Sequence, residues 1–268
     1  MNTFRIVIDE HKSFKNQLFK LAKSDLIKTY RGAALGWTWA IVKPMITIFV
    51  FWFAFTVGLR VGKTQSGYPY LLWLIAGYLP WFYMTEMISQ GSSCIRKYHY
   101  LVTKMKFPIS VIPTYVGISK LYVHFALLGV TIFMFVIFGY YPDVYYLQIP
   151  IYMTMMFVFF VVWSLFAGML SGLSKDFQNF VNACTTALFW MSGIIYDVET
   201  IHNPKIRLLL KFNPVTVIAT GYRNSFVDKK WFFEDPASLL CFTITLIFFF
   251  VLAMWAFKKL RKEIPDVL

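Results

Sequence analysis

One stretch of the chain has residue types that could bind a nucleotide: VGLRVGKTQSG, residues 57–67. Glycine-rich loops that hold ATP phosphates end in Gly-Lys-Thr, have four residues between their first glycine and that triplet, and lie between a strand and a helix. Here only three residues separate Gly58 from Gly62, and Val57 stands where the glycine should be. We therefore interpret the stretch as a chance resemblance and predict no nucleotide site.

Residues that could cut a bond or hold a metal are scattered. An intramembrane serine protease needs a serine in a Gly-x-Ser-Gly setting, but Met169 occupies the glycine position before Ser171 and Gly172. Metalloproteases of the membrane need a His-Glu-x-x-His arrangement or its reverse. The histidines do not form one: they are His11, His99, His124 and His202. We predict no catalytic residue, no metal site and no bound cofactor.

The composition places the chain in a membrane. Of its 268 residues, 58% are hydrophobic, 20% are aromatic and only 15% are charged, and the mean hydropathy is +0.59. A soluble domain carries about 25% charged residues. The net charge of +13 indicates orientation and contact with anionic lipid rather than nucleic-acid binding, because Lys and Arg gather on one side of membrane proteins.

The elements that must position any site are transmembrane helices. A spanning helix needs roughly 20 mostly apolar residues. Six stretches qualify, with the fifth short and interrupted by polar residues: 35–58, 70–92, 108–138, 148–173, 178–196 and 237–257. We predict an all-α integral membrane protein with a cytoplasmic N-terminal segment, 1–34, and a six-span domain, 35–268.

The flanking segments complete this topology. Lys and Arg on the side of the termini outnumber those on the other side about two to one, so we predict that both termini are cytoplasmic. Residues 11–28 have an apolar face at helical spacing, typical of a helix lying in the membrane interface. The semi-apolar loop 197–236 predicts two short re-entrant helices, with a compact external hairpin as the alternative.

Polar and aromatic side chains within the spans could form a path. Charged or ionisable residues in hydrocarbon are costly and indicate a polar path or a helix contact, although a long side chain can also reach the interface. These residues are Lys43, Glu86, Lys120 and His124. The first two spans are also rich in Trp, Phe and Tyr, whose faces stack on sugar rings; packing and interfacial belts are the alternative use of each ring.

Four stretches together resemble a known family: YRGAALGWTWAIVKP at 30–44, AGYLPWF at 76–82, VTKMKFPISVIP at 102–113 and LLLKFNPVTVIATGYRNSF at 208–226. They are similar to the membrane subunits of ABC type-2 exporters that move lipid-linked polysaccharides, a group that includes O-antigen, capsule and wall teichoic acid permeases. The resemblance covers nearly the whole chain. VFWFAFTVGLR and GYRNSF resemble the teichoic acid permeases most.

The resemblance implies a homodimer in the cytoplasmic membrane that works with two copies of a separate ATPase, which uses ATP and Mg. The cargo would be a glycan or polyol-phosphate polymer on a polyprenyl diphosphate, in contact with membrane lipids. The expected substrate path comprises Arg31, Trp37, Trp39, Trp52, Tyr78, Trp81, Phe82 and Glu86. An outer gate would comprise Asn213, Pro214, Tyr222 and Arg223, and an ATPase-coupling segment Arg96, Lys97, Lys104 and Lys106.

Two alternatives remain from the sequence. A small-molecule or drug exporter of the same fold would carry a substrate that is not lipid-linked. A membrane enzyme acting on lipid-linked sugars would turn over its substrate without any ATPase.

Overall fold

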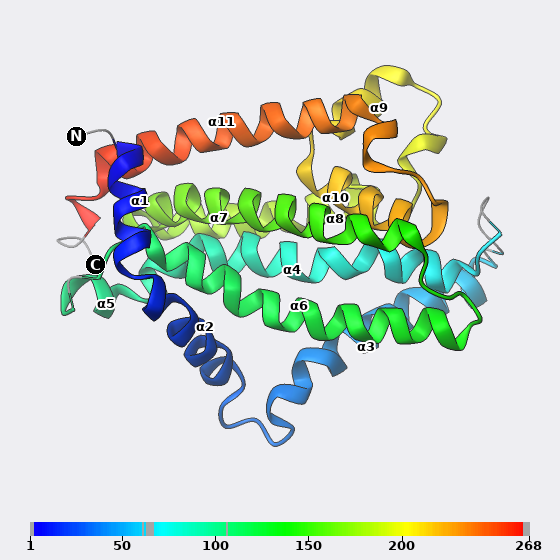
Figure 1. The fold of residues 1–268 in the computed structure, drawn as a ribbon, viewed down its shortest axis with the longest axis horizontal. Helices are drawn as coiled ribbons and strands as arrows, with labels where there is room; N and C mark the ends of the chain where they lie inside the picture. The colour runs from blue at the N-terminus through cyan, green and yellow to red at the C-terminus, as the bar shows by residue number, and fades with distance from the viewer. Residues whose placement is uncertain (1–2, 61, 63–66, 106, 265–268) are drawn as a thin grey trace.

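A computed structural model describes residues 3–60, 62, 67–105 and 107–264, which are helical with no β-strand among them. The predicted all-α fold is confirmed. The α-helices, numbered as in Figure 1, are α1 (Thr3–Ser13), α2 (Lys15–Tyr30), α3 (Trp39–Trp52), α4 (Tyr70–Lys97), α5 (His99–Thr103), α6 (Val111–Ile137), α7 (Ile149–Leu173), α8 (Lys175–Met191), α9 (Pro204–Lys211), α10 (Pro214–Arg223) and α11 (Pro236–Leu260).

Within the described part of the chain, five segments are long and apolar enough to cross a membrane: Gly36–Gly58, Tyr70–Thr103, Val111–Ile137, Val144–Leu173 and Pro236–Leu260. They match five of the six predicted spans. The remaining prediction falls on α8, which has 17 residues and is therefore about 25 Å long, less than the roughly 30 Å of hydrocarbon. By length and hydropathy the span predicted at 178–196 therefore stays a prediction. Helix α8 nevertheless packs along α4 and α7 within the bundle.

Helix α4 is the centre of the bundle and is buried along most of its length. It packs against α6, α7, α8 and α10. Gly91 permits the close contact with α7, because a methyl group at this position would overlap the hydroxyl of Ser164. Small residues bring membrane helices together in this way. Pro80 lies inside α4, where it removes one hydrogen bond of the helix.

The N-terminal segment forms two helices rather than the single one predicted. Helix α1 crosses one end of the bundle beside α11, whereas α2 runs obliquely, packed on α6, and forms a V with the returning α3 (Figure 1). The break falls at Phe14, whose ring packs on Phe107 in an edge-on contact at 4.9 Å. Leu18, Ala22 and Asp25 are the buried residues of α2, which packs against α6.

Two short helices, α9 and α10, occupy the predicted position between α8 and α11. Each begins in the same way: an asparagine side chain accepts a hydrogen bond from a backbone amide two residues later, and proline follows as the first helical residue. The caps are Asn203 and Asn213, both at 3.0 Å. Helix α10 is buried against α4 and α7, whereas α9 lies nearer the surface beside α11.

Candidate functional site

A cavity of about 510 Å³ lies between the end of α2, the first half of α3, the middle of α4 and the middle of α6. This volume falls within the roughly 300–1,000 Å³ typical of small-molecule sites. The V formed by α2 and α3 encloses it on one side (Figure 1), and α4 and α6 form its other walls.

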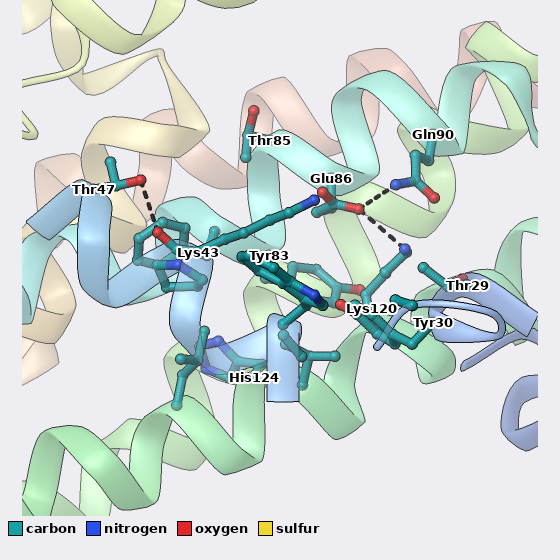
Figure 2. A pocket seen from close by; sticks show the side chains of 17 residues that line it. Thr29, Tyr30, Lys43, Thr47, Tyr83, Thr85, Glu86, Gln90, Lys120 and His124 are labelled. Atoms are coloured by element: carbon teal, nitrogen blue, oxygen red, sulfur yellow. Dashed lines mark hydrogen bonds and ion pairs between the residues drawn. The ribbon is translucent and has the colours of Figure 1, made fainter. Parts of the chain in front are cut away.

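A charged pair lies inside the cavity. Lys120 Nζ on α6 is 3.0 Å from Glu86 Oε2 on α4, and the side chain of Lys120 is only 7% exposed. The amide of Gln90 donates to the same carboxylate oxygen. Figure 2 shows Lys43 of α3 reaching across the cavity towards Glu86. An ammonium group buried among apolar helices needs such a partner, because leaving a buried charge unpaired costs several kcal/mol.

Neutral hydrogen-bonding groups complete the lining. His124 is fully buried, and its Nε2 is 2.8 Å from the hydroxyl of Tyr222 on α10. Its Nδ1 has no hydrogen-bond partner among the described residues, and neither has the buried hydroxyl of Tyr83. Buried polar atoms are usually paired. Two lining residues therefore hold a buried polar atom that no described residue pairs.

A buried carboxylate anchors the end of α2 that borders the cavity. Asp25 is 2% exposed; it accepts a hydrogen bond from Tyr98 and lies 3.2 Å from Lys97 Nζ. Burial alone would raise its pKa, but the hydrogen bond from Tyr98 and the nearby charges of Lys97 and Lys120 outweigh it, so the pKa lies below its ordinary value. This contact joins α2 to the junction between α4 and α5.

The structure divides the predicted substrate path. Trp39, Phe82 and Glu86 line the cavity. Tyr78 and Trp81 are instead buried in the core, where both pack on Phe189.

The remaining path residues lie outside the cavity lining. Trp37 is 65% exposed, Trp52 is half-buried beside Phe49, and Arg31 is exposed directly after α2.

The predicted outer-gate residues form an internal clamp. Arg223 is 3% exposed; its guanidinium donates to the carbonyl oxygens of Gly193, at 2.6 Å, and Ile194, and lies 3.5 Å above the ring of Trp73 on α4. A methyl group at Gly77 would overlap this guanidinium. The arginine therefore ties α10 to α4 and to the segment that follows α8.

The other three gate residues lie on the same helix. Asn213 caps α10 and also donates to Ser192 at 2.8 Å, and Pro214 is the first residue of α10. Tyr222 is buried and contacts His124, so it joins α10 to the cavity wall.

Two of the predicted coupling residues have partners within the chain. Arg96 donates to the carbonyl oxygens of Ser171 and Gly172 at the end of α7, and Lys97, whose side chain is 44% exposed, pairs with Asp25. Lys104 is exposed just beyond α5. Lys106 lies outside the described residues, as does Lys63 of the glycine-rich stretch.

Sequence reasoning missed Asp25 and the cavity-lining end of α2. A signal was present, because Leu18, Ala22 and Asp25 follow one another at helical spacing on the buried face. A carboxylate on the buried face of a helix indicates a cation or hydrogen-bond donor packed against it. By contrast, the helix that ends at Gly58 rules out the strand that a nucleotide-binding loop requires before it. Among the residues described, no group of three or more His, Cys, Asp or Glu could hold a metal.

Comparison with known proteins identifies the family. Residues 16–227 match the model of the ABC-2 type transporter family. The chain is 23% identical over 261 residues to the O-antigen export system permease protein RfbA of Myxococcus xanthus, covering 97% of this chain and 98% of the relative. It is 24% identical over 253 residues to a protein of the same name from Klebsiella pneumoniae, covering 94% of each. The chain, a multi-pass membrane protein, therefore belongs to the ABC-2 type transporter family.

Proposed function

We propose that this chain is the permease subunit of an ATP-driven exporter of a polyprenyl-diphosphate-linked polysaccharide of the O-antigen or capsule type. The observation that carries the proposal is the end-to-end similarity to relatives named as O-antigen export permeases, in a chain with five apolar spans. The relatives' names give no support to the narrower teichoic acid assignment. Whether the exported polymer is instead a teichoic acid is decided by the experiment below.

The proposed exporter contains two copies of this chain and two copies of a separate ATPase that uses ATP and Mg. Basic groups near the cytoplasmic entrance, among them Arg31, engage the lipid diphosphate, and the polymer passes between the protomers. The half-exposed and exposed rings of Trp37, Trp39, Trp52 and Phe82 are available for stacking on sugars. Tyr78 and Trp81 support this path from the core.

The proposed contact with the ATPase is the edge of α5 and the residues after it. His99, Thr103, Lys104 and Met105 are exposed there, and Met105 is 67% exposed. Arg96 and Lys97 are occupied by partners inside the chain, so they position this edge. An apolar residue beside a charge is typical of an interface centre and its rim.

Export is tested in cells that lack this gene. Lipid-linked polymer should accumulate in the cytoplasm, and surface polymer should return when the gene is restored. A Lys104→Glu, Met105→Asp variant should reproduce the accumulation and lose ATPase in co-purification, because it places negative charge on the coupling edge. The polymer that accumulates, analysed by mass spectrometry, separates polysaccharide from teichoic acid.

The matched control is Lys259→Glu at the exposed end of α11, which should leave both co-purification and export unchanged. Normal surface polymer in the deletion strain, together with lost efflux of a small molecule, would assign the chain to a drug exporter instead. Turnover of lipid-linked sugar by the purified chain without ATPase would make it an enzyme.

The proposed orientation puts both termini in the cytoplasm. In Figure 1 the termini lie at one end of the bundle, and the α6–α7 connection lies at the other. In a protein lacking its own cysteines (Cys94, Cys184 and Cys241), Tyr141→Cys should react with an impermeant thiol reagent in intact cells, and Lys262→Cys should not. Both positions are exposed, so the reverse labelling would invert the topology.

A further inference from the structure

The cavity between α2, α3, α4 and α6 carries an excess of positive charge. Its ionisable lining includes two lysines, Lys43 and Lys120, and one carboxylate, Glu86. Glu86 is paired with Lys120 at 3.0 Å. Among the described residues Lys43 has no ion-pair partner, and its side chain extends into the cavity in Figure 2. An anion entering the cavity would therefore meet one uncommitted ammonium group and a second one nearby.

Neutral polar side chains line the same cavity as these lysines. Tyr30 lines the cavity; burial and the charges of Glu86 and Asp25 raise the pKa of its phenol, so it remains a protonated donor. His124 also lines the cavity, and its Nδ1 has no hydrogen-bond partner among the described residues. A phenol donor beside the ammonium groups of Lys43 and Lys120 suits a phosphate group, whose oxygens accept several hydrogen bonds at once.

Apolar side chains share the lining of the cavity with these polar groups: Trp39, Pro44, Phe82 and Leu127. Lys120 lies within the apolar span Val111–Ile137, about 14 Å along α6 from its first residue at 1.5 Å per residue. A ligand that carries both a phosphate and an acyl or prenyl chain therefore satisfies the polar and the apolar parts of this lining together.

We propose that this cavity binds the phosphate of a lipid headgroup, with Lys43 and Lys120 as its cationic contacts and Tyr30 as a neutral donor. A polyprenyl diphosphate and an anionic phospholipid share this chemistry. The first would be the carrier of the exported polymer and rests on the proposed function. The second would be a lipid of the bilayer and is independent of that function.

The test measures binding to the purified full-length chain in detergent by native mass spectrometry. The probes are undecaprenyl diphosphate, phosphatidylglycerol, inorganic diphosphate, and diacylglycerol, which lacks phosphate. Lys43→Met should weaken binding of the phosphate lipid about tenfold, the loss expected for one charge-assisted contact. Lys43→Arg, which keeps the charge, should retain most binding, and Lys259→Met, at an exposed lysine of α11, should retain all of it.

Glu86→Gln gives a change of opposite sign. Removing the carboxylate releases Lys120 from its ion pair, so the phosphate lipid should bind several times more tightly, a gain that misfolding does not produce. Binding of undecaprenyl diphosphate alone identifies the carrier, and binding of phosphatidylglycerol identifies a bilayer lipid; either supports the site.

Three results would overturn the assignment: equal binding by Lys43→Met and Lys259→Met, equal binding of diacylglycerol, or inorganic diphosphate binding as tightly as the lipids. Export is measured separately in cells. If a variant loses lipid binding but exports normally, the carrier does not use this cavity and the proposed function stands. If the wild-type chain exports no polymer but binds the phosphate lipid, the proposed function fails and the site stands.

Discussion

Replacing Arg223 with methionine should lower the free energy of unfolding by about 3 kcal/mol or more. The substitution leaves the carbonyl oxygens of Gly193 and Ile194 without their buried donor, at about 1–3 kcal/mol for each unsatisfied group. It also removes the stacking of the guanidinium on Trp73. The measurement is the unfolding transition of the purified protein in detergent, which should shift to a lower temperature.

Arg207→Met is the matched control, because Arg207 is 38% exposed and pairs with Glu199 at 3.4 Å on the surface. Exposed pairs contribute about 0–1 kcal/mol, so its transition should move little. A second variant, Gly77→Ala, should imitate the loss of Arg223, since its methyl group would displace the guanidinium from its place. Equal transitions for Arg223→Met and Arg207→Met would show that the clamp does not stabilise the fold.

Replacing Asp25 with alanine should release α2 from the α4–α5 junction and lower the free energy of unfolding by about 2–3 kcal/mol. Asp25 is a buried charged acceptor for Tyr98 and Lys97, and hydrogen bonds to charged groups contribute about 1.5–3 kcal/mol each. Hydrogen–deuterium exchange should increase along α2. Asp9→Ala, at an exposed position on α1, is the control and should leave the exchange of α2 unchanged.

The same contact has a defined pH dependence. The folded-state pKa of Asp25 is lowered from its ordinary value of 3.8, so its contribution is fully present above that value and declines as the pH falls through the folded-state pKa. Exchange along α2, divided by the intrinsic amide-exchange rate at each pH, should therefore be constant between about pH 5 and 8 and increase in acid below about pH 4. In Asp25→Ala this acid-induced increase should be absent. An unchanged increase in the variant would assign it to another group.

Much of the fold was predictable because hydropathy and length are local properties. Five spans, the two short helices after α8 and the interface segment all follow from them. The break between α1 and α2 was not predictable, because the residues on both sides of it share an amphipathic pattern. The contact of Phe14 with Phe107, which is distant in sequence, accompanies the break. The span predicted at 178–196 stays a prediction: α8 covers its first part and ends at Met191, so residues 192–196 lie beyond the helix.

The cavity was predictable only in part. Glu86 and Lys120 stand out in the sequence as charges within apolar spans, but their pairing depends on how α4 and α6 pack. Asp25 and Lys97 are 72 residues apart, and the turn of α2 that brings them together is set by its packing on α6. Tyr78 and Trp81 illustrate the opposite limit: an aromatic pattern does not distinguish a ring that lines a path from one that fills the core.

Pro80 divides α4 into two halves that make different contacts. Before Pro80 lie Trp73 and Gly77, which contact Arg223. After it lie Glu86, which lines the cavity, and Arg96 and Lys97, whose contacts with α7 and Asp25 hold the end of α4 next to the coupling edge. The missing hydrogen bond makes bending at Pro80 easier than elsewhere in the helix. A push at the α5 end would therefore tilt the cavity half while the clamped half stays fixed, so α4 would work as a lever whose fulcrum is Pro80.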